Sequence, residues 1–141
     1  MKKNEAGLNL YIFKSHLNFS GIVLSIFNIL KTFVNFESKL IFIQNFVLIK
    51  SLIDELFEFL IFYSKDHMEN SFFLLNDQYL DILKSILNLY SQPVLVLIYT
   101  LLTTIKKNNA KIYSIDLINS LIEYFFSNVK FIFIYYSLSL Y

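Results

Sequence analysis

Two histidines are the side chains of this chain best suited to acid–base or ligand chemistry. His67 lies in Lys65-Asp66-His67-Met68-Glu69, beside two carboxylates that could help it to hold a metal ion or form an acid–base pair. Such a site needs three or four converging ligands, and a solvated loop supplies neither the rigidity nor the desolvation that would tune a pKa. We therefore expect His67 to be an exposed loop histidine.

His16 stands near the start of the first apolar stretch of the chain. It could ligate a haem if that stretch entered a membrane. The sequence offers no second axial ligand and no arginine to pair with the haem propionates. We expect a structural role for His16.

Three acidic residues fall close together in a segment with helical periodicity. Asp54 and Glu58 are four residues apart, which places them side by side on a helix, and Glu55 lies next to them. Paired carboxylates can do hydrolytic work, but on a helix surface they more often face solvent or a partner. We interpret them as a solvated or docking face.

The other common signatures of catalysis are missing from the sequence. Gly7 and Gly21 are isolated and form no phosphate-binding loop, no Ser/His/Asp arrangement can be recognised, and the chain has no cysteine. The sequence thus predicts no catalytic residue, no metal ligand and no cofactor, and we expect that the chain is not an enzyme.

Composition and charge narrow the possible partners. Phe, Tyr, Met, Ile, Asn and Lys account for 72 of the 141 residues, whereas Gly, Ala, Arg and Pro account for 5, a bias typical of genes in AT-rich genomes. Part of the high apolar content reflects this bias. The formal charge is +1, and all 12 basic residues are lysines. Nucleic acid is therefore not an expected partner.

Polar residues recur at helical spacing through most of the chain, which predicts an all-α protein. We expect one domain over residues 1–141, with about five helices. An N-terminal helical pair covers about 20–63, with helices near 20–36 and 39–63. The polar segment 64–71 is predicted to be a loop. Core positions are expected at Ile26, Leu30, Phe42, Leu56, Ile82, Leu95 and Ile122.

The C-terminal half is expected to hold further helices over about 77–129. Pro93 either starts a new helix in its first turn or kinks a continuing one. Ser114 is a plausible N-cap for the last helix. The apolar tail 130–141 is rich in β-formers and could be helical or a single strand.

One uncharged interval, Ser85 to Ile105, has the length of a membrane span. As one helix its 21 residues would extend roughly 31 Å. Its first third continues the polar stripe of the preceding segment, however, and the fully apolar part, Val94 to Ile105, covers only about 18 Å. The sequence alone permits either one transmembrane helix in the bundle or a core helix buried by protein.

The aromatic residues indicate surface that a partner must cover. The chain has 16 Phe and 10 Tyr but no Trp. A domain of this length must leave part of that apolar area exposed, and large exposed apolar patches mark interfaces or lipid contacts.

Two resemblances follow from these features. The composition resembles mitochondrion-encoded respiratory-complex subunits of AT-rich protists. The order of segments in 91–140, namely QPVLVLIYTLLTTIKKNN, IDLINSLIEYFF and VKFIFIYYSLSL, looks like the end of the N-terminal helical domain of the ATP synthase peripheral-stalk subunit (delta, or oligomycin-sensitivity). That family has an Arg where this chain has Asn108 to Ala110, its Tyr-Ala-x-Ala signature is absent, and no functional residue transfers.

These resemblances imply a non-catalytic structural subunit of a large mitochondrial inner-membrane assembly, a respiratory-chain or ATP synthase complex. The expected location is the inner membrane or its matrix face, and the expected partners are protein subunits of that complex, with membrane lipid as a further contact. A soluble helical adaptor, such as a peripheral-stalk-like subunit, is the alternative. A supernumerary mitochondrial ribosomal protein is a third class, disfavoured by the low positive charge.

Overall fold

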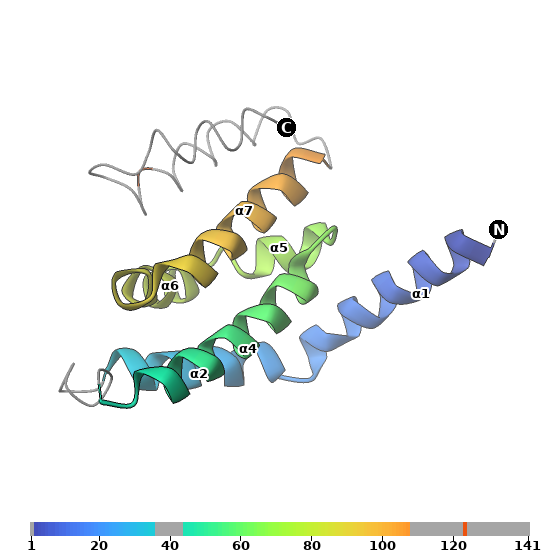
Figure 1. The fold of residues 1–141 in the computed structure, drawn as a ribbon. Coiled ribbons are helices and arrows are strands. Elements are labelled where there is room, and N and C mark those ends of the chain that lie inside the picture. Colours follow the sequence, from blue (N-terminus) through green and yellow to red (C-terminus); the bar gives the residue numbers. More distant parts are fainter. Residues whose placement is uncertain (1, 36–43, 108–122, 124–141) are drawn as a thin grey trace.

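The described part of the chain is built from helices alone. A computed structural model describes residues 2–35, 44–107 and 123, and in this part we find six α-helices, one short 3-10 helix and no strand (Figure 1). The elements are α1 (Lys2–His16), η1 (Leu17–Phe19), α2 (Ile22–Val34), α4 (Phe46–Ser64), α5 (Met68–Phe73), α6 (Asp77–Leu89) and α7 (Ser91–Lys107). The prediction of an all-α bundle is confirmed. The predicted helix from Ser114 and the tail 130–141 lie outside the described residues.

Four helices, α2, α4, α6 and α7, enclose the apolar core. The α4 helix packs along α7, and α6 packs against both α2 and α7. Each helix contributes side chains at spacings of three or four residues, so one stripe of each faces inward. Fully buried members of this core include Leu30, Ile53, Phe57, Leu60, Leu83, Ile86, Leu97 and Leu101. Burial of each such side chain stabilises the fold by about 1.5 to 3 kcal/mol before entropy costs.

The expected core positions are confirmed in part. Ile26 and Leu30 are buried. Leu56, Ile82 and Leu95 are half-buried and pack against the core from its edge. Phe42 and Ile122 lie outside the described residues.

The uncharged interval Ser85 to Ile105 is divided between two helices. The α6 helix ends at Leu89, Tyr90 is extended with φ −149° and ψ 96°, and α7 begins at Ser91. Pro93 therefore stands in the first turn of a new helix, where its missing N–H has no intrahelical partner to lose. Much of α7 is covered by neighbouring helices. The structure does not support a transmembrane helix in this interval.

Length and apolar composition together single out no individual helix of the described residues as a membrane span. The α1–η1 segment and α2, taken as Glu5–Phe19 and Ile22–Val34, meet these criteria only as a pair, and they are bent by 60°.

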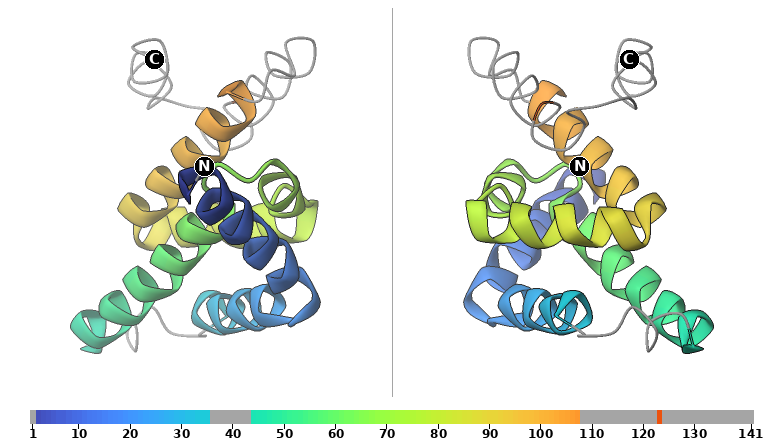
Figure 2. Two further views of the ribbon diagram at one scale, coloured as in Figure 1. Left: turned by 90° about the vertical axis from the view of Figure 1, so that its right-hand side faces the viewer. Right: turned by 90° about the vertical axis from the view of Figure 1, so that its left-hand side faces the viewer.

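The N-terminal helix α1 was not predicted from the sequence. It projects from the bundle, so its N-terminal end lies apart from the other helices (Figure 1), and the left view of Figure 2 looks at the bundle from the side of this end. Side chains from Glu5 to Phe13 are all exposed. Gly21 follows η1 with φ +72°, a left-handed conformation in which a glycine avoids the strain that a Cβ would add. This glycine lets the chain turn from η1 into α2.

The segment 64–71, predicted as a loop, contains most of a short helix. Only Lys65 to His67 are non-helical, and α5 begins at Met68. Asp66 has a positive φ of 55°. The prediction of a loop throughout this segment is therefore wrong, because His67 caps α5 and the polar side chains of Asn70 and Ser71 are buried.

Candidate functional site

His67 is fully buried, which contradicts its predicted exposure. Its side chain has 0% exposure and lies between α1 and the start of α5. The Tyr11 ring of α1 stacks on the imidazole with centroids 4.0 Å apart. The prediction failed because the residues that cover His67 come from α1, more than fifty positions away in sequence, whereas the neighbours of His67 in sequence are polar.

Both ring nitrogens of His67 have hydrogen-bond partners. Nδ1 lies 3.2 Å from the backbone nitrogen of Asn70, whose N–H donates to it, so His67 is the N-cap of α5. Nε2 lies 2.9 Å from Oγ of Ser15 and 3.2 Å from the carbonyl oxygen of Tyr11. An amide N–H can only donate, so Nδ1 is the unprotonated nitrogen and the neutral ring carries its proton on Nε2.

This arrangement argues against a Ser–His nucleophile pair. A general base for Ser15 would need an unprotonated Nε2 that accepts the hydroxyl proton. Here Nε2–H donates to Ser15 and Tyr11, while the Ser15 hydroxyl donates to the Tyr11 carbonyl at 3.1 Å. Burial lowers the pKa of His67, an effect that nearby Lys14 adds to and that the Tyr11 carbonyl and Glu69 oppose. The contacts therefore join α1 to α5.

Asn70 is the centre of this junction. Its Nδ2 donates to the carbonyl oxygens of Lys14 at 3.0 Å and Tyr63 at 2.9 Å. Its Oδ1 accepts from Nδ2 of Asn18 at 2.8 Å. The Tyr63 hydroxyl in turn donates to Oδ1 of Asn18. One buried amide thus links α1, η1, α4 and α5, and all of its hydrogen-bonding groups are used.

A buried lysine completes the junction. Lys14 is only 7% exposed, its Nζ donates to the carbonyl oxygen of Lys65 at 3.0 Å, and it lies 4.6 Å from the centroid of the Phe62 ring. Burial lowers the pKa of Lys14, and Asp66 opposes this effect. We call the set Tyr11, Lys14, Ser15, Asn18, Tyr63, His67 and Asn70 the polar junction.

His16 does not join the polar junction. It is exposed at the end of α1, and its ring lies 6.4 Å from the ring of Phe19, measured between centroids. The two histidines therefore lie in different environments.

The three predicted acidic residues separate into two environments. Asp54 is half-buried, and its Oδ1 accepts a hydrogen bond from the Tyr90 hydroxyl at 2.6 Å. Burial raises the pKa of Tyr90 to about 12, and the hydrogen bond to Asp54 adds to this effect. Glu55 and Glu58 are exposed. Asp54 is thus a structural acceptor between α4 and the start of α7.

Two surface grooves lie beside these residues. Asp54 and Glu58 line one of about 430 Å³ between α4 and α7, together with Lys50 and Tyr90. Glu55 lines the edge of another, of about 520 Å³, between α2 and α4. Within residues 2–35, 44–107 and 123, no three His, Asp or Glu side chains converge as a metal site would require.

The sequence could have pointed to the polar junction through one signal. Asn18 interrupts an uncharged stretch, and Asn70 follows the N-cap position His67 by three residues. Both segments therefore carry polar side chains that need partners if they are buried. That signal does not say which segments meet.

Comparison of the chain with protein-family models, with curated proteins and with solved structures finds no significant match.

Proposed function

We propose that this protein is a non-catalytic structural subunit of a larger assembly, and that it binds partner subunits through exposed apolar side chains of α4 and α2. The observation that carries the proposal is the exposure of Val47 and Leu48 on the first turn of α4, at 82% and 77%. Removing such apolar side chains from water lowers the free energy, so a partner that covers them is bound more tightly.

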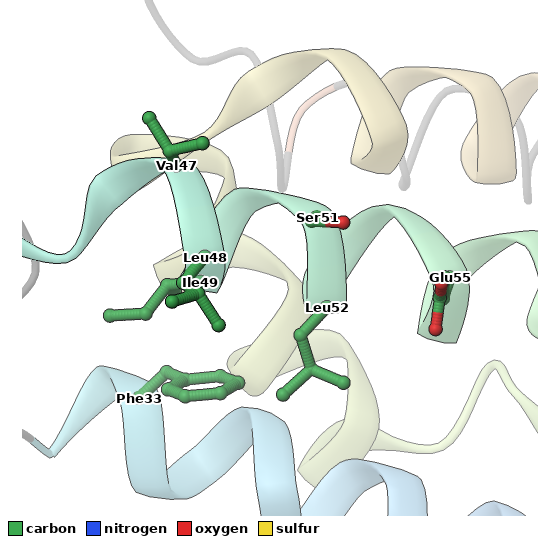
Figure 3. A pocket seen from close by; sticks show the side chains of 7 residues that line it. All are labelled: Phe33, Val47, Leu48, Ile49, Ser51, Leu52 and Glu55. Carbon is green, nitrogen blue, oxygen red and sulfur yellow. The ribbon is translucent and has the colours of Figure 1, made fainter.

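Val47 and Leu48 are among the residues that line a groove between two helices. The groove between α2 and α4 is lined by Phe33, Val47, Leu48, Ile49, Ser51, Leu52 and Glu55 (Figure 3). Leu52 of α4 and Phe33 of α2 point toward one another across it, while Val47 points to the opposite side of α4. We call this set the α2–α4 surface. A helix with a row of apolar side chains fits such a groove, with Val47 making further contact outside it.

The non-catalytic part of the proposal rests on the polar junction. The histidine closest to a serine hydroxyl is held in the tautomer that cannot accept the serine proton, and its buried ring offers no access to a substrate.

We further propose that the assembly is a respiratory-chain or ATP synthase complex at the mitochondrial inner membrane. The support is compositional: the residue usage matches that of proteins encoded in AT-rich organelle genomes. Partner subunits or lipid would cover the exposed apolar side chains.

A soluble helical adaptor is the second candidate. The observation that favours it is the burial of α7, the most apolar part of the Ser85 to Ile105 interval, by α4, α5 and α6 rather than by lipid. A ribosomal subunit is disfavoured by the formal charge of +1.

Carbonate extraction of native membranes, followed by sizing in mild detergent, separates these candidates. Membrane retention with migration in a large complex supports the inner-membrane subunit. Release into the supernatant within a large complex favours the adaptor. A stable monomer of 16.7 kDa contradicts both.

A double variant tests the surface itself. Val47→Asp with Leu48→Asp places two charges on the α2–α4 surface and should abolish migration in the complex without unfolding the chain, since both side chains are exposed. Gln78→Asp adds a charge at an exposed position of α6; it is the matched control and should leave the complex intact. Equal migration of both variants in the complex would rule out this surface.

A further inference from the structure

The polar junction places a titratable ring where a change of charge would act on one helix. We propose that the polar junction is a pH-sensitive clasp, in which protonation of His67 releases α1 from the bundle while α2, α4, α6 and α7 stay packed.

Protonation removes an acceptor that α5 requires. The Asn70 N–H donates to Nδ1 of His67, and an imidazolium carries a proton at both ring nitrogens. Two donors would then face each other across 3.2 Å, and α5 would lose its N-cap. The junction cannot keep its present geometry with a charged ring.

Burial makes the charged ring costly in this position. His67 has 0% exposure, so an imidazolium there would have no water around it. The Tyr11 ring and carbonyl offer partial compensation. Moving α1 aside admits water to the ring and relieves the cost.

The charged groups around His67 come from every neighbouring element. Lys14 of α1 disfavours the imidazolium, whereas Glu69 of α5 favours it. Lys65 and Asp66 lie in the connection before α5, and Asp66 forms an exposed ion pair with Lys107 of α7 at 3.5 Å. Tyr63 of α4 stays neutral through this range, because burial raises its pKa. Burial outweighs the favourable groups, and the pKa of His67 is lowered.

The direction of the pH effect follows. With a pKa below 6.5 in the clasped state, His67 supports the clasp fully above pH 6.5, and this support is lost as pH falls from 6.5 through the lowered pKa. His67 binds the proton more readily when α1 is released than when α1 is clasped, so acid shifts the population toward release.

The rest of the bundle does not depend on these contacts. Outside its own continuation into η1, α1 packs chiefly on α5, and its side chains from Glu5 to Phe13 are exposed. The contacts of α4 with α7 and of α6 with α2 and α7 are mainly apolar, and burial raises the pKa of Tyr79 among them, so this tyrosine stays neutral where His67 titrates. Release of α1 therefore leaves the core in place.

Hydrogen–deuterium exchange of the full chain, corrected for intrinsic rates, tests the clasp at pH about 7.5 and about 5.0. We expect amides of the second half of α1 to exchange at least about ten-fold faster at the lower pH, with α4 and α7 unchanged. His67→Asn keeps an N-cap acceptor but does not titrate, so its α1 exchange should not differ between the two conditions. His16→Asn, at the exposed histidine, should keep the wild-type difference.

NMR titration of the wild-type imidazoles gives a measurement that needs no altered junction, with the His16→Asn spectrum assigning the signals. We expect the His67 ring to be the Nε2–H tautomer and to titrate below 6.5. A His67 pKa at or above 6.5, an α1 that exchanges equally at both pH values, or a pH difference that persists in His67→Asn would each overturn the proposal.

Discussion

The two buried regions of this protein hold helices together by different means. The core of α2, α4, α6 and α7 uses aliphatic and aromatic side chains whose contacts have no directional requirement. The polar junction uses hydrogen bonds in which each donor needs one particular acceptor, as Asn70 and His67 illustrate. The core therefore supplies most of the stability, and the polar junction fixes where one helix sits.

The largest expected effect is in the core. Phe57→Ala removes a ring that is 1% exposed and should lower the free energy of unfolding by about 3 to 5 kcal/mol, measured by urea denaturation followed by circular dichroism. Phe72→Ala removes the same ring from a position that is 44% exposed and should cost far less. Similar losses for both variants would contradict the assigned core.

A smaller but more localised loss is expected in the polar junction. Asn70→Ala leaves the carbonyl oxygens of Lys14 and Tyr63 and the amide of Asn18 without their partner, and should cost about 2 to 3 kcal/mol. Hydrogen exchange should place most of the loss in α1 and α5. Asn88→Ala, at an exposed position of α6, is the control. A uniform loss of protection across all helices in Asn70→Ala would show that the two regions are not separable.

The Tyr90 ring packs against the apolar core while its hydroxyl donates a hydrogen bond to Asp54, and we expect this contact to contribute less to stability than Asn70 does. Tyr90→Phe removes the hydroxyl and should cost about 1 kcal/mol, since both groups are partly exposed. Because the folded pKa of about 12 exceeds the ordinary value of 10.0, the contribution of Tyr90 is fully present below pH 10 and is lost as pH rises toward 12. Ultraviolet titration of tyrosine checks this, and Asp54→Asn should bring the midpoint of Tyr90 closer to 10.0.

The smallest effect is expected at the surface ion pair. Lys107 and Asp66 are 73% and 59% exposed, so Lys107→Met should change stability by less than about 0.5 kcal/mol. A loss comparable to that of Asn70→Ala would mean that Asp66 holds the connection before α5 far more firmly than its exposure indicates. Thermal unfolding at two salt concentrations measures the difference.

The sequence predicted the core better than the polar junction, for a physical reason. Helical periodicity indicates which face of a segment is apolar, so α2, α4, α6 and α7 and the burial of Ile26 and Leu30 could be predicted. Polar groups are buried only when partners from other segments satisfy them, as Ser15 and Asn70 do for His67. That pairing has no periodic signal in the sequence.

The helix α1 escaped prediction for a related reason. Its residues from Glu5 to Phe13 are exposed on all sides and show no apolar stripe. Periodicity arises from a face that packs, and most of α1 packs on nothing that the structure describes. The boundary between α6 and α7, at Tyr90, was hard to predict for another reason. The apolar run around it does not indicate where one helix ends and the next begins.

The left-handed Gly21, between η1 and α2, marks a point about which α1 could rotate relative to the bundle. A helix of 15 residues is about 22 Å long, so a rotation of about 10° at its anchored end sweeps the far tip through about 4 Å. The polar junction holds α1 at its C-terminal end, close to this pivot, where small displacements break hydrogen bonds. Because α1 is held only near its C-terminal end, a small displacement beside His67 becomes a displacement of several ångströms at Glu5.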